Sequence, residues 1–306
     1  AERVIRSLLA ELPDGELRAV DYLDDDGLGT ADVRIALSLR IEGESATFDF
    51  TGTAPQVRGS LNAVEAITLS AVTYALRLAA AEDVPVNAGT FRPIRLIAPL
   101  GTLVNARPQA AVAGGNVETS QRIVDVALAA LAQALPDRIP AASQGTMNNV
   151  TFGSTEAGRT YAYYETIGGG AGAGSSWDGT SGVQIHMTNT LNTPVEAIER
   201  SAPVRIARYA LRRGTGGAGA HRGGDGIERV YHFLEEAEVS VLSERRTHGP
   251  YGLAGGEPGT PGANSVRLPD GTQEALPGKF RRTLPAGAEL TIATPGGGGW
   301  GISETA

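Results

Sequence analysis

The 306-residue chain contains no cysteine and only one lysine, Lys279. Without thiols it can form neither a disulfide framework nor a cysteine nucleophile, which fits a cytoplasmic setting. Phosphate-binding loops of the Gly-x-x-x-x-Gly-Lys-Ser/Thr type need a lysine at the phosphates. Lys279 lies instead in a Pro-Gly-Lys-Phe turn, so a nucleotide site of this type is excluded.

Several other signatures are also missing. No Gly-x-Ser-x-Gly elbow for a serine nucleophile occurs. The absence of a signal peptide and of any apolar run near 18 residues predicts no membrane span. A net charge of −8 argues against a nucleic-acid partner. No His-x-x-x-His spacing is present, so the sequence predicts no metal ligand; the four histidines are His186, His221, His232 and His248.

Glycine, by contrast, is abundant, with 41 residues in 306 against a usual ~7%. The glycines cluster, which indicates specific turns and close backbone approaches rather than a flexible tail. Residues 214–219 match Gly-x-Gly-x-x-Gly, but His-Arg-Gly-Gly-Asp-Gly follows instead of an amphipathic helix. A dinucleotide site is therefore rejected on context.

Hydrophobic periodicity predicts an α+β fold with mixed or antiparallel sheets. Apolar residues at helical spacing predict a short helix over 4–12 and two long helices, over 62–81 and from Asn116 to about 135. Alternation over 33–50 around Gly43 predicts a hairpin. Short strands and glycine loops dominate the second half, and nothing supports repeated βαβ units. The expected strands are 94–97, 102–105, 150–152, 161–166, 183–187, 227–234, 239–242 and the surroundings of 266–268 and 290–292, with a helical turn over 194–200.

The change of character near Asn149 suggests an α+β region over 1–149 and a mainly β, glycine-rich region over 150–306. These regions form either two domains or one continuous domain.

The stretch from Gly114 to Asn149 carries the densest polar pattern. Asn116 is expected to cap the second long helix, and further polar residues surround that helix start. An amide-rich segment follows the helix. Either the helix ends are simply capped and satisfied, or the helix start holds a planar amide or a carboxylate. The polar residues are Asn116, Glu118, Thr119, Ser120 and Gln121 at the helix start, then Gln144, Asn148 and Asn149.

Two other polar groups leave alternatives open. Tyr163 and Glu165 should share one side of a strand that leads into a glycine run, which either admits a substrate or packs tightly on its own sheet. Arginines and acids in 212–225 and 243–246 form either a structural network or a carboxylate-binding group. Residues 24–26, three aspartates, fit a solvated turn or a weak cation site.

Long segments in one order, from about Phe48 to the C-terminus, resemble the hydantoinase B/oxoprolinase family. They are Gly-Gly-Asn-Val-Glu-Thr-Ser-Gln-Arg (114–122), Ser-Gln-Gly-Thr-Met-Asn-Asn (143–149), Tyr-Tyr-Glu-Thr-Ile-Gly-Gly-Gly (163–170), Trp-Asp-Gly-Thr (177–180), His-Met-Thr-Asn-Thr (186–190), Arg-Arg-Gly-Thr-Gly-Gly-Ala-Gly (212–219), His-Arg-Gly-Gly-Asp-Gly (221–226), Leu-Ser-Glu-Arg-Arg (242–246) and Thr-Pro-Gly-Gly-Gly-Gly-Trp-Gly (294–301).

The resemblance implies an ATP-dependent hydrolase that opens cyclic amides such as hydantoins, 5-oxoproline or lactams. A hydantoinase A-like partner with an actin-like fold would bind ATP and phosphorylate the amide oxygen. The B part would then deliver water at a divalent metal. Family B chains are longer at the N-terminus, where the metal ligands lie, so no ligand is carried over to this chain. It is expected to be a fragment or a split subunit that works with the N-terminal half and is inactive alone.

As a hypothesis, the polar residues described above line or support the reaction cavity, and no catalytic residue is assigned. The residues expected to line or support the cavity are Asn116, Glu118, Thr119, Ser120, Gln121, Asn148, Asn149, Glu165 and His186. Two alternatives stay open: part of the large subunit of an ATP-dependent acetone or acetophenone carboxylase, and a non-catalytic scaffold subunit.

Overall fold

The computed structural model describes residues 1–80, 82–155 and 160–303, which separate into two compact units. The first unit comprises Ala1–Pro140 with Gly174–Ser176, and the second comprises Ala141–Ala173 with Trp177–Ala306. The change between units falls after Pro140, whereas the sequence analysis divides the chain after Asn149.

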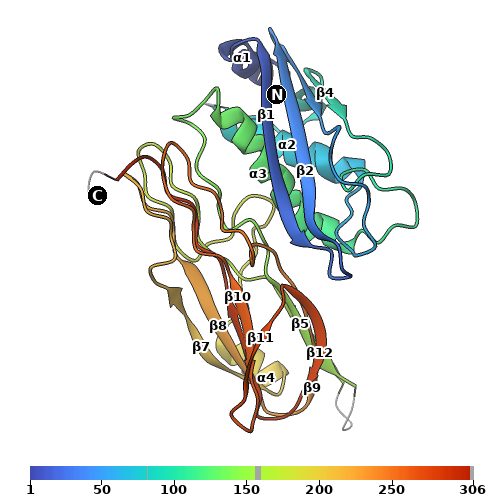
Figure 1. Cartoon of the computed structure of the whole chain (residues 1–306), viewed down its shortest axis with the longest axis vertical. Helices are drawn as coiled ribbons and strands as arrows, with labels where there is room; N and C mark the ends of the chain where they lie inside the picture. The colour runs from blue at the N-terminus through green and yellow to red at the C-terminus, as the bar shows by residue number, and fades with distance from the viewer. Residues whose placement is uncertain (81, 156–159, 304–306) are drawn as a thin grey trace. The chain divides into compact units, whose positions relative to one another are not determined.

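The first unit packs helices against one four-stranded sheet of order β1-β2-β3-β4 (Figure 1). Neighbouring strands are antiparallel except β3 and β4, which are parallel. Helix α3 contacts β1, β2 and α2. The elements are α1 (Glu2–Glu11), β1 (Gly15–Asp25), β2 (Ala31–Glu42), β3 (Ser45–Asp49), α2 (Glu65–Ala79), η1 (Ala88–Phe91), β4 (Ile94–Ile97), η2 (Gly115–Thr119) and α3 (Ser120–Ala132).

The expected hairpin over 33–50 is confirmed as β2 and β3, because the alternating apolar side chains of β2 all face the core. Strand β1 was not expected. Its inward-facing position Asp21 is polar and pairs with the fully buried Arg122 at 3.1 Å. This ion pair interrupts the apolar alternation by which a strand is recognised.

The start of the second long helix differs from the expectation. The chain enters the helix through η2, one π-helical turn, so Asn116 lies inside that turn and is not the N-cap. A Cβ on Gly115 would lie 2.2 Å from Asn62 O, so the first residue of this turn must be glycine. The wider π turn then leads directly into α3.

The second unit is built on two sheets that enclose one hydrophobic core (Figure 1). One sheet has the order β11-β10-β13-β8-β7 and the other β12-β9-β5-β6. Phe152 of β5 meets Tyr231 and Phe233 of β8 edge-on, at 5.6 and 5.5 Å between ring centroids. The elements are β5 (Asn149–Ser154), β6 (Tyr161–Glu165), α4 (Val195–Ser201), β7 (Val204–Arg212), β8 (Gly226–Phe233), β9 (Ala237–Leu242), β10 (Ala263–Arg267), β11 (Gln273–Leu276), β12 (Lys279–Leu284) and β13 (Glu289–Ala293).

Glycine-rich segments of the second unit lie side by side and exchange backbone hydrogen bonds. Ala173 N donates to Gly298 O, and Gly298 N donates to Ala142 O. A Cβ on Gly172 would lie 1.8 Å from Ala141 O. The glycine run after Glu165 therefore packs backbone on backbone, as the tight-packing interpretation expects.

Most expected elements are present. Residues 102–105 and 183–187 form only isolated bridges, so the two strands expected there are wrong. Strands β7, β11 and β12 were missed because much of each is exposed and polar. The sequence also predicts a turn over 155–159, between the strands expected at 150–152 and 161–166, and most of it lies outside the described residues. The α+β class with antiparallel and mixed sheets is confirmed. No helix within the described ranges has the length and apolar character needed to cross a bilayer.

Candidate functional site

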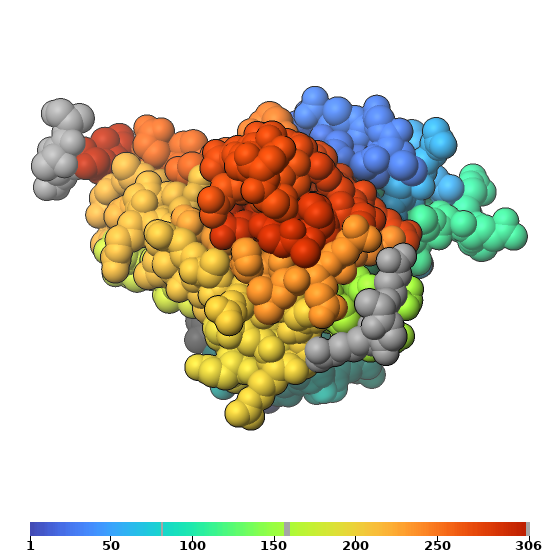
Figure 2. Space-filling view, turned by 90° about the horizontal axis from the view of Figure 1, so that it is seen from below, coloured from blue at the N-terminus to red at the C-terminus, as the bar shows by residue number. Residues whose placement is uncertain are grey.

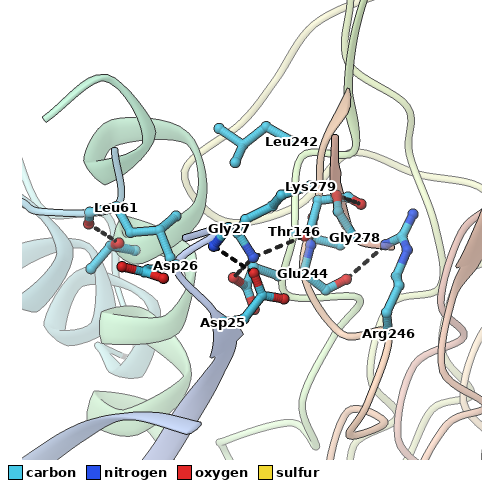
Figure 3. Close-up of polar contacts among 12 residues, drawn as sticks. Asp25, Asp26, Gly27, Leu61, Thr146, Leu242, Glu244, Arg246, Gly278 and Lys279 are labelled. Atoms are coloured by element: carbon cyan, nitrogen blue, oxygen red, sulfur yellow. Dashed lines mark hydrogen bonds and ion pairs between the residues drawn. The ribbon is translucent and has the colours of Figure 1, made fainter. Parts of the chain in front are cut away.

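The one lysine of the chain is not in an open turn. Lys279, at the start of β12, donates to Glu244 Oε1 at 2.6 Å, and the two side chains are 7% and 0% exposed (Figure 3). Glu244 N donates to Thr146 Oγ1 at 3.0 Å, and Arg246 Nη1 donates to Glu244 O at 2.7 Å. We call Thr146, Ser243, Glu244, Arg246 and Lys279 the Lys279 cluster.

The amide-rich segment is held by side-chain hydrogen bonds of its own within the second unit. Asn149 Nδ2 donates to Leu242 O at 2.9 Å, and Tyr164 Oη donates to Asn149 Oδ1 at 2.7 Å. Asn148 Nδ2 donates to Gln144 Oε1 and to the carbonyl of Ile167. The structure thus joins Gln144 and Asn148 to each other, whereas the Asn149 side chain is bound to Leu242 and Tyr164.

Four non-glycine residues among the described part of the second unit adopt the left-handed backbone conformation. Their φ angles are 47° at Asn148, 56° at His186, 60° at Arg245 and 52° at Ala254. The conformation is uncommon for side chains other than Asn, Asp and His, and strained residues gather at functional sites. Asn148 and Arg245 belong to the two segments that the Thr146–Glu244 hydrogen bond joins.

Glu165 is buried between the two sheets and accepts four hydrogen bonds. Its Oε1 accepts from Arg229 Nε at 2.7 Å and from Tyr231 Oη, and its Oε2 accepts from Tyr163 Oη at 3.1 Å and Asn192 Nδ2 at 2.8 Å. Tyr163 and Glu165 therefore do share one side of β6. We call these five residues the Glu165 cluster.

The environment fixes the protonation of the tyrosines in the Glu165 cluster. Burial, followed by the negative charge of Glu165, raises the pKa of Tyr231 well above its usual value. Burial also raises the pKa of Tyr163. Both phenols remain protonated near neutrality and act as hydrogen-bond donors to the carboxylate.

The polar residues at the helix start lie in the first unit. Thr119 Oγ1 donates to Leu61 O, and Ser120 Oγ donates to Asn116 O at 2.5 Å. Glu118 and Gln121 are fully buried, whereas Asn116 is exposed. The two hydroxyls therefore hold the π-helical turn, and Asn116 is the helix-start residue open to solvent.

The arginine-rich segment over 212–225 is held by its own chain. Asp225 Oδ1 accepts from the backbone N of Thr215 and Gly216 and from Arg222 Nη2. Arg212 Nη1 donates to Pro261 O at 2.7 Å. These contacts favour the structural interpretation of this segment.

The structure adds residues that sequence reasoning missed. Arg229 and Tyr231 lie on the same face of β8 as two apolar residues, Ile227 and Phe233, and nothing in the sequence distinguishes them from other strand residues. Asn192 lies in a polar loop. Lys279 is distinguished only by being the single lysine. Its partner Glu244 lies 35 positions away, so no local spacing reveals the pair.

The described residues do not fit a metal site. Across residues 1–80, 82–155 and 160–303, no group of three or more His, Asp or Glu side chains is placed to hold an ion. Asp26, one of the three aspartates over 24–26, instead serves a turn, where its Oδ1 accepts from Leu28 N and Thr30 N at 2.9 Å.

Comparison with known proteins identifies relatives of the chain. A family model described as Hydantoinase B/oxoprolinase matches residues 1–303. The chain is 47% identical over 281 residues to 5-oxoprolinase 1 of Arabidopsis thaliana, covering 92% of this chain and 21% of that protein. It is 33% identical over 315 residues to the putative D-/L-hydantoinase B subunit of Pseudomonas sp. (strain NS671), covering 98% and 53%.

Two solved structures share the fold. The ATP-dependent caprolactamase from Pseudomonas jessenii matches with a TM-score of 0.86 and 27% identity, covering 98% of this chain and 54% of that one. Acetone carboxylase in its nucleotide-free form matches with a TM-score of 0.84 and 15% identity, covering 98% and 47%. The chain thus spans between about a fifth and about half of the length of these proteins.

Proposed function

The chain belongs to the hydantoinase B/oxoprolinase family, and on that premise we propose that it forms part of an ATP-dependent hydrolase of cyclic amides. The overall reaction converts a ring amide, two water molecules and ATP into the ring-opened acid, ADP and phosphate. The acid is an amino acid when the substrate is a lactam and an N-carbamoyl amino acid when it is a hydantoin. Hydantoins, 5-oxoproline and lactams are the substrate class. The 27% identity to a caprolactamase supports amide chemistry, whereas the 15% identity to acetone carboxylase supports a shared fold alone.

In this proposal the phosphoryl transfer takes place on a hydantoinase A-like ATPase partner, which phosphorylates the amide oxygen. The observation that carries this division of labour is the Lys279–Glu244 pair. The only ammonium side chain of the chain is 7% exposed and donates to a buried carboxylate at 2.6 Å. A lysine committed in this way does not serve as the mobile point charge that a phosphate loop requires.

We further propose that the divalent metal that activates water is held by another part of the enzyme, such as the N-terminal half of the B subunit. The described residues supply no ligand set for it, so no step is assigned to a metal on this chain. Side chains of this chain would bind and orient the ring amide. Asn116, Glu118 and Gln121 are the candidates in the first unit, and Asn148, Asn149 and His186 those in the second.

The test uses the chain assembled with its ATPase partner and the remainder of the B subunit. ADP release coupled to ring opening is measured with hydantoin, 5-oxoproline and caprolactam. Acetone with bicarbonate is the parallel assay for the carboxylase alternative. Ring opening without carboxylation supports the proposal, whereas a carboxylated product from acetone would replace it.

Asn116 provides the sharper test, because it is exposed and its substitution leaves the core intact. Asn116→Ala is expected to lower ring-opening turnover about tenfold, as the loss of one hydrogen bond that strengthens in the transition state would. Gln273→Ala, which removes an exposed amide on β11, is the matched control. Unchanged turnover in Asn116→Ala would remove this residue from the site.

A further inference from the structure

The Arg229 guanidinium uses only part of its hydrogen-bonding capacity. Its side chain is fully buried, and Nε donates to Glu165 Oε1 at 2.7 Å and to Tyr231 Oη at 3.1 Å. Nη1 and Nη2 have no hydrogen-bond partner among the described residues. Buried donors without acceptors destabilise a fold, so these two groups need a further explanation.

Glu165 does not provide the missing acceptor. Its two oxygens already accept four hydrogen bonds, from Arg229, Tyr231, Tyr163 and Asn192. A guanidinium can bind one oxyanion through its Nε side and a second through the fork of Nη1 and Nη2. In Arg229 the first of these is occupied by Glu165, and the second is open to another acceptor.

One side of the Arg229 guanidinium is covered by an aromatic ring that is itself partly exposed. The ring of Tyr209 lies 4.3 Å from Arg229 Cζ, in a cation–π contact, and Tyr209 is 47% exposed. It follows a bulge in β7, the edge strand of its sheet. Its hydroxyl donates to Asn192 Oδ1 at 3.2 Å. The yellow segment that contains β7 forms part of the surface shown in Figure 2.

The loop that carries Asn192 is also exposed. Residues 189–191 and 193–194 are exposed, with Leu191 98% accessible. Thr190 and Asn192 attach the loop to Thr166 and Glu165 through side-chain hydrogen bonds. The Tyr209 ring and this loop are thus the exposed parts of the chain that contact Arg229 and its partner Glu165.

We propose that the Nη1–Nη2 fork of Arg229 binds a small oxyanion, a carboxylate or a phosphate, which enters when Tyr209 and the 189–193 loop move aside. The site is independent of the proposed hydrolase function, because it rests on the contacts of Arg229 alone. A carboxylate matches the planar fork with two parallel hydrogen bonds, and a phosphate offers the same pair of oxygens.

The test titrates the 306-residue chain with sodium acetate and, separately, with sodium phosphate. Sodium chloride keeps the ionic strength constant, and calorimetry and thermal unfolding report binding. Saturable binding of either anion is expected, and the comparison of the two shows which chemistry the site prefers. Tyr209→Phe keeps the ring but loses the Asn192 hydrogen bond, so the cover opens more easily and binding should tighten about fivefold.

Arg229→Lys keeps the charge but removes the fork, and it should weaken binding at least about tenfold. Arg208→Lys is the matched control. Arg208 is an exposed arginine on the neighbouring strand β7, and it pairs with Glu228 at 2.9 Å. The affinity of Arg208→Lys for the anion should equal that of the wild type. The proposal is overturned if neither the wild type nor Tyr209→Phe shows saturable binding, or if Arg229→Lys binds as the wild type does. Should Arg229→Lys fail to fold, an unchanged affinity in Tyr209→Phe would by itself overturn it.

Discussion

At the scale of single residues, the second unit retains a carboxylate and a guanidinium between two apolar sheets. Removing both ions from water is unfavourable, and their attraction compensates only if further hydrogen bonds satisfy the remaining groups. Glu165 meets that condition with donors from β6, β8 and the Asn192 loop. Arg229 meets it only in part. Removing the charge of either residue is therefore expected to destabilise the folded state.

Glu165→Gln is expected to lower the free energy of unfolding by about 3–5 kcal/mol, because it leaves the buried Arg229 charge uncompensated. Urea denaturation measures the change. Tyr163→Phe removes one of the four hydrogen bonds and is the matched control, with an expected loss of about 1 kcal/mol. A loss in Glu165→Gln no larger than in Tyr163→Phe would show that the ion pair is not the main stabilising contact.

Sequence periodicity located Glu165 and its partner Tyr163, but not the partners Arg229, Tyr231 and Asn192. The two-residue period of a strand places Tyr163 and Glu165 on one side, and the structure confirms this arrangement. Arg229 lies 64 positions away, so its pairing depends on which strands face each other across the core. The same limit applies to Lys279 and Glu244, whose pairing the sequence does not reveal.

At the scale of elements, the turn between β1 and β2 depends on one carboxylate. Burial acts to raise the pKa of the Asp26 carboxyl, but the N–H groups of Thr30, Leu28 and Gly59 outweigh burial and lower it below its usual value. The ionised form is thus favoured in the folded state. The stabilisation is present above the unfolded-state pKa, near pH 4, and is lost as the pH falls through the lower folded-state pKa.

The wild-type chain is therefore expected to lose stability as the pH falls below about 4, and Asp26→Asn should reduce this loss. The measurement is the urea midpoint of each protein at a series of pH values. Asp137→Asn, at an exposed aspartate, is the control and should follow the wild type. Parallel curves for wild type and Asp26→Asn would contradict the role given to Asp26.

The glycine-rich segments of the second unit belong to no regular secondary structure. They carry neither the period of a helix nor that of a strand, so the sequence indicates close approaches without naming the partners. By contrast, α1, α2 and the β2–β3 hairpin were predictable because one apolar face repeats along each. Strand β1 was not, since Asp21 on its inner face pairs with Arg122.

Gly172→Ala should prevent folding of the second unit, because the added Cβ would lie 1.8 Å from Ala141 O, and backbone atoms on both sides would have to separate. Gly271→Ala separates this effect from backbone strain. Gly271 has a φ of 89° and no atom within 4 Å of an added Cβ, so its substitution should reduce stability by only about 1–2 kcal/mol. Circular dichroism and thermal unfolding check both variants, and a normally folded Gly172→Ala would disprove the close packing inferred here.

At the scale of the whole molecule, the candidate site residues are divided between two compact units. Asn116 to Gln121 lie in the first, and Asn148, Asn149, Glu165 and His186 lie in the second. The family followed from long segments in a fixed order, and the α+β class followed from hydrophobic periodicity; both are visible in the sequence alone. The detailed contacts of each site residue did not, because they depend on segments far apart in the chain.

Whether the chain itself hydrolyses the ATP that drives ring opening is the property of the whole molecule that can be tested most directly. The only lysine is paired with Glu244 at 2.6 Å, and the glycine segments that resemble nucleotide loops pack against other backbone. The purified chain is therefore expected to release no ADP from ATP and magnesium, with or without hydantoin. Adding the ATPase partner and the remainder of the B subunit should start ADP release in step with ring opening. A coupled assay measures ADP, and chromatography measures the ring-opened product. The control replaces the chain by its Gly172→Ala variant, which should support no ring opening. ATP hydrolysis by the chain alone would mean that phosphoryl transfer occurs on this polypeptide, and the proposed division of labour would then be wrong.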